Sequence, residues 1–349
     1  MPRIVRVTTE VLADRANPQL IVTVEDEDGI CGIGETWWGP YLPDRTPGAP
    51  VKPLASMIDE VLAPLCIGQD GDDIGSLWES MFRATYQYGP HGVVSSAIAG
   101  VDLALWDLAG RRSDCPVADL LGPRVHDRLP AYASLHWCGD PGLACAEAQR
   151  AVAAGFRAVK LHERDPALVR AVRAAVGPEI DLMLDVSGRW ELDEVADRAG
   201  ELADLGLLWV EEPIFPQQDH RALGECEMVI TSRLAAGENE FHSGGFAALI
   251  EVAGASVLQP DLVKAGGLTL SAGYGALASA HQVWLCPHNF SLGPSLGANI
   301  HWAVTEPAAR YIELPFLPEA GRFPGEWAMP TLDPEGCVAA PQHPGLDWT

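Results

Sequence analysis

The stretch 207–213 reads Leu-Leu-Trp-Val-Glu-Glu-Pro. A short apolar run that ends in carboxylates and a proline is typical of a buried strand whose last residues leave the sheet. Similar runs lie on either side of it, at 181–187 and 234–239, and each contains an acidic residue near its end. The intervals between the runs leave room for a helix, which predicts parallel strands joined by helical crossovers.

Five further runs continue this pattern, and amphipathic stretches such as 166–176 and 191–205 lie between them. Repeated strand–helix units of this size, eight in number, predict an α/β chain that closes into a barrel. The eight runs are 131–137, 158–162, 181–187, 207–213, 234–239, 256–263, 283–288 and 308–315.

A polar residue near the end of seven of these runs recurs at intervals of 23 to 27 residues. In a barrel of this type, the C-terminal ends of the strands converge on one face, and that face carries the active site. We therefore expect seven ionisable side chains to meet in one pocket: Lys160, Asp185, Glu211, Glu238, Asp261, His288 and Glu313.

Asp185, Glu211 and Glu238 are carboxylates at the ends of three consecutive predicted strands. Carboxylates that share a pocket repel one another unless a cation joins them. Oxygen ligands without Cys or His favour Mg²⁺, with Mn²⁺ as a substitute, over zinc. The alternative is that the three residues form separate salt bridges.

Asp261 and His288 end the next two predicted strands. A carboxylate bonded to one imidazole nitrogen fixes the tautomer and makes the other nitrogen more basic. This pair is therefore predicted to act as a general base near neutral pH. The alternative for His288 is a structural histidine held by hydrogen bonds.

Lys160 and His162 lie two residues apart on one strand, so both point into the barrel. They are predicted to form a second acid/base arm or to hold the substrate carboxylate. The alternative is that Lys160 only neutralises the acidic cluster. Glu313 is predicted to donate a hydrogen bond to the substrate if it is held protonated. A structural ion pair is the alternative for Glu313.

Residues 1–127 are predicted to form a separate α+β domain, with a strand meander followed by helices. The motif Gly32-Ile33-Gly34-Glu35 lacks the third glycine of a dinucleotide-binding loop. Trp38 and Tyr41 follow it, and they either cover the substrate pocket or form a small local core. Residues 128–320 are predicted to form the barrel, and residues 321–349 a tail that packs on the first domain.

The composition excludes some classes of partner. The net charge is −25, which argues against nucleic acid and anionic membrane surfaces, because both require a basic patch. We find no apolar run of bilayer length and no signal peptide pattern, so the cytoplasm is the expected compartment. The eight cysteines form no Cys-x-x-Cys pair and are expected to be reduced.

At these motifs the chain resembles the enolase superfamily, and within it the mandelate racemase-like subgroup. The resemblance covers nearly the whole chain and implies an α+β capping domain, a (β/α)₇β modified TIM barrel and a tail that returns to the cap. It also implies Mg²⁺ ligation by Asp185, Glu211 and Glu238, a base at His288 oriented by Asp261, and a homo-oligomer. Muconate-lactonising and dipeptide-epimerising relatives carry a lysine at position 261, so those two activities are disfavoured.

The chain departs from the subgroup pattern at two positions. His162 replaces the second lysine of a Lys-x-Lys motif, which puts a racemase with a lysine base in doubt. Ser187 stands where some relatives carry a histidine acid, and a serine cannot fill that role. The acid for a leaving group must then be His288, His162 or water.

The expected reaction removes the proton next to a substrate carboxylate and forms a metal-stabilised enediolate. Because histidines flank the site, we expect loss of a β-hydroxyl from a sugar acid, an aldonate or an aldarate, to give a 2-keto-3-deoxy acid. Racemisation or epimerisation of a 2-hydroxy acid is the alternative reaction. A barrel that binds sugar acids without turnover is the alternative of another class.

Overall fold

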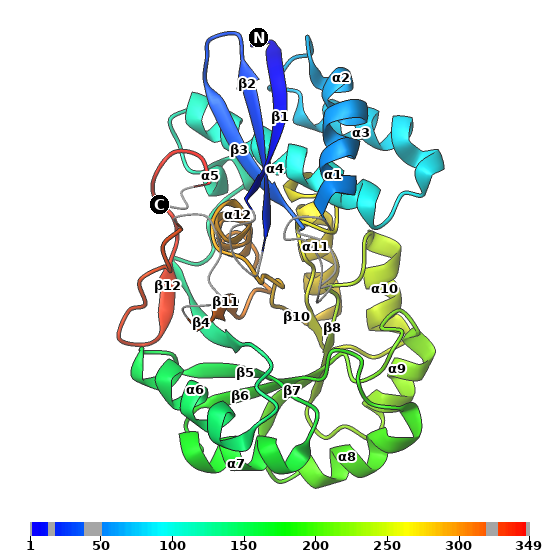
Figure 1. Ribbon diagram of the computed structural model, residues 1–349, viewed down its shortest axis with the longest axis vertical. Helices are drawn as coiled ribbons and strands as arrows, with labels where there is room; N and C mark the ends of the chain where they lie inside the picture. Colours follow the sequence, from blue (N-terminus) through cyan, green and yellow to red (C-terminus); the bar gives the residue numbers. More distant parts are fainter. Residues whose placement is uncertain (1, 13–17, 38–50, 319–326, 347–349) are drawn as a thin grey trace.

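The computed structural model describes residues 2–12, 18–37, 51–318 and 327–346. Within these ranges, eight parallel strands form one curled sheet in the order β10-β9-β8-β7-β6-β5-β4-β11 (Figure 1). The barrel fold predicted from the spacing is confirmed. The strands are β4 (Arg128–Leu135), β5 (Ala158–His162), β6 (Asp181–Asp185), β7 (Leu207–Glu211), β8 (Arg233–Ala236), β9 (Val257–Leu258), β10 (Trp284–Leu285) and β11 (Ile312–Phe316).

The two edges of the curled sheet meet at a single bridge. Leu285 pairs with Ala309, and its backbone N–H donates to the carbonyl of Ala308 at 2.9 Å. Strands β9 and β10 are shorter than the runs expected at 256–263 and 283–288. Pro260 and Pro287 explain the difference, because a proline has no N–H to donate to a ladder. Asp261 and His288 therefore sit on loops just beyond their strands.

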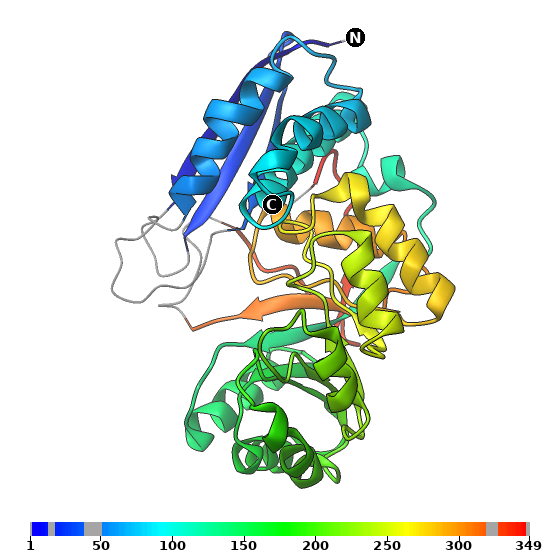
Figure 2. The same ribbon diagram turned by 90° about the vertical axis from the view of Figure 1, so that its right-hand side faces the viewer.

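A helix follows each of the first seven barrel strands and covers the outside of the sheet (Figure 2). Helix α7 illustrates why these segments are helical: Asp165 caps its N-terminus by accepting from Ala167 N at 2.9 Å, and Pro166 is its first residue. Gly177, with φ of 81°, ends it. The seven are α6 (Pro141–Ala153), α7 (Pro166–Val176), α8 (Val195–Leu202), α9 (His220–Glu227), α10 (Ser243–Glu251), α11 (Ser271–His281) and α12 (Pro294–Ala303), with 3₁₀ turns η4 (Leu192–Glu194) and η5 (Leu268–Leu270).

The cap is an antiparallel meander packed against helices. Its strands are β1 (Ile4–Leu12), β2 (Gln19–Asp26) and β3 (Cys31–Thr36). Its helical segments are α1 (Lys52–Met57), η2 (Ile58–Leu62), α2 (Ala63–Cys66), α3 (Ile74–Thr85), η3 (Tyr86–Tyr88), α4 (Val93–Arg112) and α5 (Val117–Leu121).

Helix α4 lies directly on strand β3. A Cβ atom at Gly32 would come 2.1 Å from the carbonyl oxygen of Ala104, and one at Gly34 would come 2.3 Å from that of Gly100. The Gly-x-Gly motif is therefore explained by close packing of strand on helix. Helix α4 is long and apolar enough to cross a bilayer, but 83% of the apolar stretch is buried inside the protein, as in a core helix.

Side-chain contacts and the C-terminal segment join the cap to the barrel. The backbone N–H of Thr269 donates to Asp102 of α4 at 3.0 Å, and the indole of Trp78 donates to Gly266 O at 2.7 Å. Strand β12 (Cys337–Ala339) pairs antiparallel with β4 of the barrel. Further on, the carbonyl of Gly345 accepts from Val117 N at 3.0 Å, so the tail returns to the cap.

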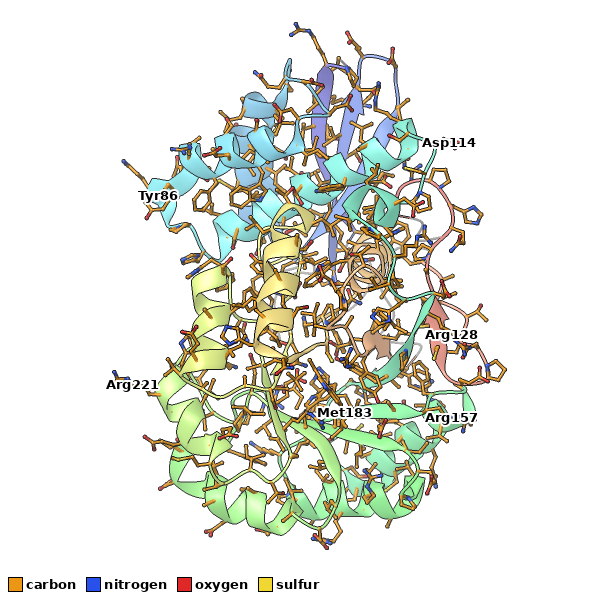
Figure 3. The ribbon with its side chains drawn as sticks, turned by 180° about the vertical axis from the view of Figure 1, so that it is seen from behind. Tyr86, Asp114, Arg128, Arg157, Met183 and Arg221 are labelled. Atoms are coloured by element: carbon orange, nitrogen blue, oxygen red, sulfur yellow. The ribbon has the colours of Figure 1, made fainter. Side chains whose placement is uncertain are left out.

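A layer of large side chains fills the inside of the barrel. Tyr132, Met183 and Trp209 are fully buried there, and Met183 is labelled within the lower half of the molecule in Figure 3. Each lies two residues before a polar residue of its strand, so both members of a pair face inward. This apolar layer lies directly beneath the polar residues at the ends of the strands.

Candidate active site

A cavity of about 640 Å³ opens at the C-terminal ends of the barrel strands. Five residues of the predicted site line it: His162, Asp185, Glu238, Asp261 and His288. Lys160 and Glu313 are buried and contact the lining residues Asp185 and Asn289. Glu211 is also buried, with an oxygen within 4.8 Å of Asp185 and Glu238, so the structure brings the eight polar candidates together. Trp38 and Tyr41, the predicted substrate-binding residues, lie outside the described residues; their neighbour Trp37 lines the cavity.

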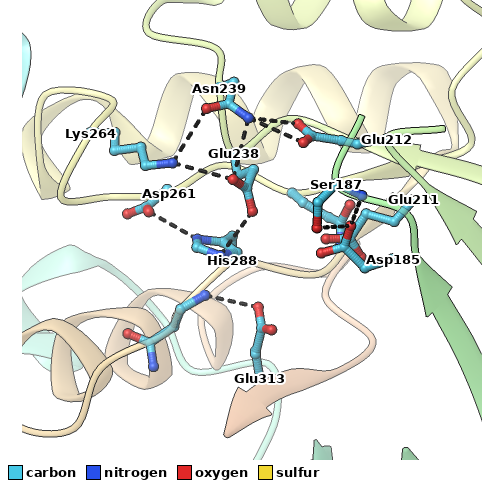
Figure 4. Close-up of polar contacts among 12 residues, drawn as sticks. Asp185, Ser187, Glu211, Glu212, Glu238, Asn239, Asp261, Lys264, His288 and Glu313 are labelled. Carbon is cyan, nitrogen blue, oxygen red and sulfur yellow. Dashed lines mark hydrogen bonds and ion pairs between the residues drawn. The ribbon is translucent and has the colours of Figure 1, made fainter. Parts of the chain in front are cut away.

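Asp185, Glu211 and Glu238 form a compact group of carboxylates. One oxygen from each lies within 4.8 Å of the other two (Figure 4). Asp185 and Glu211 end strands β6 and β7, and they are paired across these strands. Glu238 follows β8 after Gly237, whose φ of 144° and whose contact with Gln259 leave no room for a side chain. The group is thus an oxygen-rich site of the type that holds a hard divalent cation.

Glu211 is the most buried of the three carboxylates. Its Oε1 accepts from Lys160 Nζ at 2.8 Å, and its Oε2 accepts from Gln259 Nε2 at 2.7 Å and from Trp209 Nε1 at 3.0 Å. Burial raises the pKa of Glu211 to about 7, against the opposing charge of Lys160. The carboxylate is therefore costly to keep ionised, and a cation at the site would lower that cost.

Asp185 is oriented by the residue two positions further on. Ser187 donates to its Oδ1 from the backbone at 2.6 Å and from the hydroxyl at 3.0 Å. Ser187 adopts φ of 51°, which is rare for a residue with a side chain and is maintained here by these two bonds. Although burial acts to raise the pKa of Asp185, the charges of His162 and Lys160 outweigh it and lower the pKa.

Asp261 and His288 form the predicted hydrogen-bonded pair. His288 Nδ1 lies 2.9 Å from Asp261 Oδ2, and its Nε2 lies 2.9 Å from Glu238 Oε2 (Figure 4). Asp261 is itself held by Val263 N at 3.0 Å. Burial acts to lower the pKa of His288, but Glu238 and Glu313 raise it well above its ordinary value. The imidazole is thus fixed at both nitrogens and directed at the carboxylate cluster.

Lys160 is fully buried and lies among three acidic groups. Its Nζ is 2.8 Å from Glu211, 2.9 Å from Glu313 and 3.9 Å from Asp185. Burial acts to lower the pKa of Lys160, but Glu211 and Glu313 outweigh it and raise the pKa well above its ordinary value. Lys160 is therefore a permanent cation in this site.

His162 lies beside Lys160 on the same strand. Its Nε2 lies 3.0 Å from Asp185 Oδ2, and its Nδ1 contacts the carbonyl of Leu135. Burial acts to lower the pKa of His162, but Asp185 outweighs it and raises the pKa. Both ring nitrogens are therefore engaged by protein groups, as they are in His288.

The contacts of Glu313 favour a structural ion pair over a hydrogen-bond donor to the substrate. Its Oε1 faces Lys160, and its Oε2 accepts from Asn289 N at 3.0 Å. Burial acts to raise the pKa of Glu313, but Lys160 and His288 outweigh it and lower the pKa. As a carboxylate, Glu313 accepts hydrogen bonds and cannot donate one to the substrate.

Several supporting residues lie outside the set of site residues that was predicted from the sequence. Glu212 accepts from Asn239 Nδ2 with both oxygens, at 3.0 and 3.1 Å, and Gln259 holds Glu211. Lys264 Nζ lies 3.4 Å from Glu238. The contact of Trp209 with Glu211 could have been predicted from the sequence, because the two residues lie two positions apart on the same face of one strand. The others lie on loops, where periodicity gives no signal.

Comparison with known proteins assigns the family. Residues 5–122 match the family described as Mandelate racemase / muconate lactonizing enzyme, N-terminal domain, and residues 144–347 match Enolase C-terminal domain-like. The chain belongs to the enolase superfamily. The resemblance to its mandelate racemase-like subgroup is thereby confirmed.

Three similar proteins have names that state an activity. The chain is 31% identical to the L-rhamnonate dehydratase of Saccharopolyspora erythraea over 342 residues, 94% of this chain and 82% of that protein. It is 33% identical to the D-galactonate dehydratase of Ralstonia pickettii over 320 residues, 86% and 78% of the two chains. It is 30% identical to the 3,6-anhydro-alpha-L-galactonate cycloisomerase of Streptomyces coelicolor over 338 residues, 93% and 87%. These relatives are lyases and isomerases, the two enzyme classes that the sequence favoured.

Solved structures of superfamily members agree with this fold over its whole length. The 3,6-anhydro-D-galactonate cycloisomerase of Zobellia galactanivorans superposes with a TM-score of 0.87 and 27% identity, covering 99% of this chain and 95% of that one. A racemase from Streptomyces coelicolor A3(2) with bound magnesium superposes with a TM-score of 0.84 and 28% identity, covering 99% and 97%.

Proposed function

We propose that this protein dehydrates a sugar acid, an aldonate or an aldarate, to a 2-keto-3-deoxy acid with Mg²⁺ as cofactor. One observation carries the proposal: three converging carboxylates, a buried lysine and a His–Asp pair surround one cavity of about 640 Å³. That volume is within the range of small-molecule sites. The dehydratases among the relatives support the choice of reaction.

The donor set fits a divalent cation. Asp185, Glu211 and Glu238 present oxygens within 4.8 Å of one another, and burial raises the pKa of Glu211 to about 7 against the opposing charge of Lys160. Mg²⁺ would be held by these three residues, with Mn²⁺ as a substitute, since both prefer oxygen ligands. When bound, the ion supplies Lewis-acid stabilisation of the charge that develops on the substrate carboxylate.

His288 takes the proton next to the substrate carboxylate in this proposal. Nδ1–H donates to Asp261, which fixes the tautomer and leaves Nε2 to receive the proton. The pKa of His288 is raised mainly by Glu238, so the neutral imidazole forms when that carboxylate is balanced by a cation. General base catalysis of this kind contributes about 10²- to 10⁴-fold to a rate.

In this proposal Lys160 stabilises the developing negative charge from its buried position beside Asp185, which lines the cavity. Its ammonium group is fixed by Glu211 and Glu313, so it needs no reorganisation when charge develops on the substrate. His162 is placed beside it as the second arm. Loss of the β-hydroxyl then gives an enol, which becomes the 2-keto product.

The proposal is tested by incubating the protein with a panel of aldonates and aldarates in D₂O with Mg²⁺. We expect one member to give a 2-keto-3-deoxy acid, detected as its semicarbazone and by NMR. Deuterium incorporation at C2 without 2-keto product from any member would rule out dehydration and leave racemisation or epimerisation. His288→Asn is the matched control, because it keeps a polar side chain but removes the base.

Cycloisomerisation is the second candidate, because cycloisomerases are among the similar proteins. In this proposal it begins with the same proton abstraction and differs in what happens to the enediolate. The panel therefore includes 3,6-anhydro-galactonates. Binding without turnover would be indicated if a sugar acid raises the unfolding temperature but shows neither exchange nor product. A homo-oligomer, a cytoplasmic location and the absence of nucleic acid or membrane partners stay predictions.

A further inference from the structure

A third histidine, which the sequence reasoning passed over, lines the same cavity. His136 directly follows strand β4, beside β5. The two strands pair at Ala133↔Val159 and Ser134↔Lys160. Continued by two residues, this register places His136 next to His162, and both line the cavity.

His136 differs from the other two lining histidines in its contacts. His162 and His288 each have both ring nitrogens engaged by protein groups. Among the described residues, the imidazole of His136 has no hydrogen-bond partner, and its Nδ1 is buried from solvent. Because Nδ1 is inaccessible and His136 lines the cavity, Nε2 is the ring nitrogen that is left for a ligand in the cavity. His136 is thus available to the substrate, whereas the other two are already positioned.

The groups near His136 indicate which part of a ligand it would meet. The metal-ligand carboxylates and the Asp261–His288 pair occupy the side of the cavity formed by β6 to β10. On the side of β4, the lining residues include Trp137, and Arg189 packs over its ring at 5.8 Å. Gln217 adds a neutral hydrogen-bonding group to the lining, whereas the hydroxyl of Ser187 already donates to Asp185. Such groups suit the hydroxyls of a polyhydroxy chain.

We propose that His136 is a catalytic acid of the dehydration, donating its proton to the hydroxyl that leaves from C3. This role rests on the proposed function. His288 takes the C2 proton, the electron pair of that bond forms C2=C3, and the C3–O bond breaks. The oxygen leaves with its electron pair and takes the proton of His136, forming water. The enol then takes up a solvent proton at C3 and loses its hydroxyl proton at C2 to solvent, which gives the 2-keto acid. His288 releases the C2 proton to solvent, and His136 takes one up from solvent.

The test separates proton abstraction from loss of the leaving group. His136→Asn and His136→Gln are compared with the unaltered protein on the acid that the panel identifies and on its 3-deoxy-3-fluoro analogue. We expect dehydration of the hydroxy acid to fall about 10²- to 10⁴-fold, the range for a lost general acid. Exchange of the C2 proton in D₂O should stay within a few-fold of the unaltered protein. Elimination of fluoride, which leaves without a proton, should also be retained.

Two controls keep the outcome unambiguous. His281→Gln replaces a histidine at the exposed end of α11, away from the cavity. It should leave the rates of dehydration, C2 exchange and fluoride elimination unchanged. Retained C2 exchange in the His136 variants itself shows that the site is folded. Equal loss of exchange, dehydration and fluoride elimination would overturn the acid role, and so would unchanged dehydration. If the unaltered protein forms no 2-keto acid from any panel member, the proposed function fails first, and the acid role fails with it.

Discussion

The backbone N–H of Ser295, at the start of barrel helix α12, donates to Oε2 of Glu35 in the cap at 3.1 Å. Glu35 is 1% exposed and also accepts from Gln19 Nε2 at 2.9 Å and from the hydroxyl of Ser291. Ser295 Oγ in turn donates to Asn289 at 2.7 Å, the residue after His288. The last residue of the Gly-x-Gly-Glu motif therefore joins the cap to the loop that carries the proposed base.

Glu35 makes the stability of the protein depend on pH. Burial raises the pKa of Glu35 to about 7, from an ordinary value of 4.5. The folded state therefore binds the proton more tightly than the unfolded state, so this contribution to stability falls as pH rises from about 4.5 to 7. The free energy of unfolding, relative to that of Glu35→Gln, should decrease by on the order of 3 kcal/mol across that window. A difference that is flat with pH in urea titrations would contradict this assignment.

Removal of divalent metal should abolish activity and lower stability. EDTA should eliminate turnover, and Mg²⁺ or Mn²⁺ should restore it, because the three carboxylates otherwise repel one another. In calorimetry, Mg²⁺ should raise the unfolding temperature of the unaltered protein by linkage. Asp185→Asn and Glu238→Gln should lose that rise, whereas the exposed Glu79→Gln should keep it. Full activity in the presence of EDTA would exclude the metal site.

Asp261 and His288 should behave as one unit in a double-mutant cycle. His288→Asn should lower kcat by about 10²- to 10⁴-fold, since the base is removed. Asp261→Asn should lower kcat by a smaller factor, because the neutral amide no longer holds His288 in the required tautomer. The double variant should be no worse than His288→Asn alone. Additive losses would show that Asp261 acts independently of His288.

Replacement of Lys160 should destabilise the protein as well as inactivate it. Lys160→Ala leaves Glu211 and Glu313 buried without their cation, and breaking a buried pair costs about 3–5 kcal/mol. Adding Glu313→Gln should recover part of this loss, because one unpaired charge is removed. Denaturant titrations of both variants check the expectation. A double variant less stable than Lys160→Ala would argue against the ion pair.

The packing of β3 on α4 should be intolerant of a single methyl group. At Gly34 an added Cβ would lie 2.3 Å from Gly100 O and 2.6 Å from Ala104 N, so Gly34→Ala forces the strand off the helix. We expect a loss of about 1–3 kcal/mol in the free energy of unfolding, the range for overpacking. Gly75→Ala, in α3 with open space around it, is the matched control and should be neutral or stabilising.

The arrangement of the barrel was determined by local features of the sequence. Apolar runs such as 207–213, helical stretches between them and polar residues every 23 to 27 positions dictate parallel strands with their functional ends on one face. The convergence of Asp185, Glu211 and Glu238, and the pairing of Asp261 with His288, follow from that topology alone. Periodicity is a property of neighbouring residues, so a single chain read in order is enough to show it.

Only the tertiary structure decided which side chains of the site are ionised, which are hydrogen-bonded and which are left without a partner. Glu313 is an ionised partner of Lys160 because the bend of the closing sheet puts them 2.9 Å apart, a distance that no sequence interval encodes. Glu35 reaches Ser295, 260 positions away, only because the cap packs on the barrel. The imidazole of His136 has no hydrogen-bond partner among the described residues, although the residue lines the cavity. Such contacts depend on the relative positions of several elements at once, and those positions arise only when the whole core has packed.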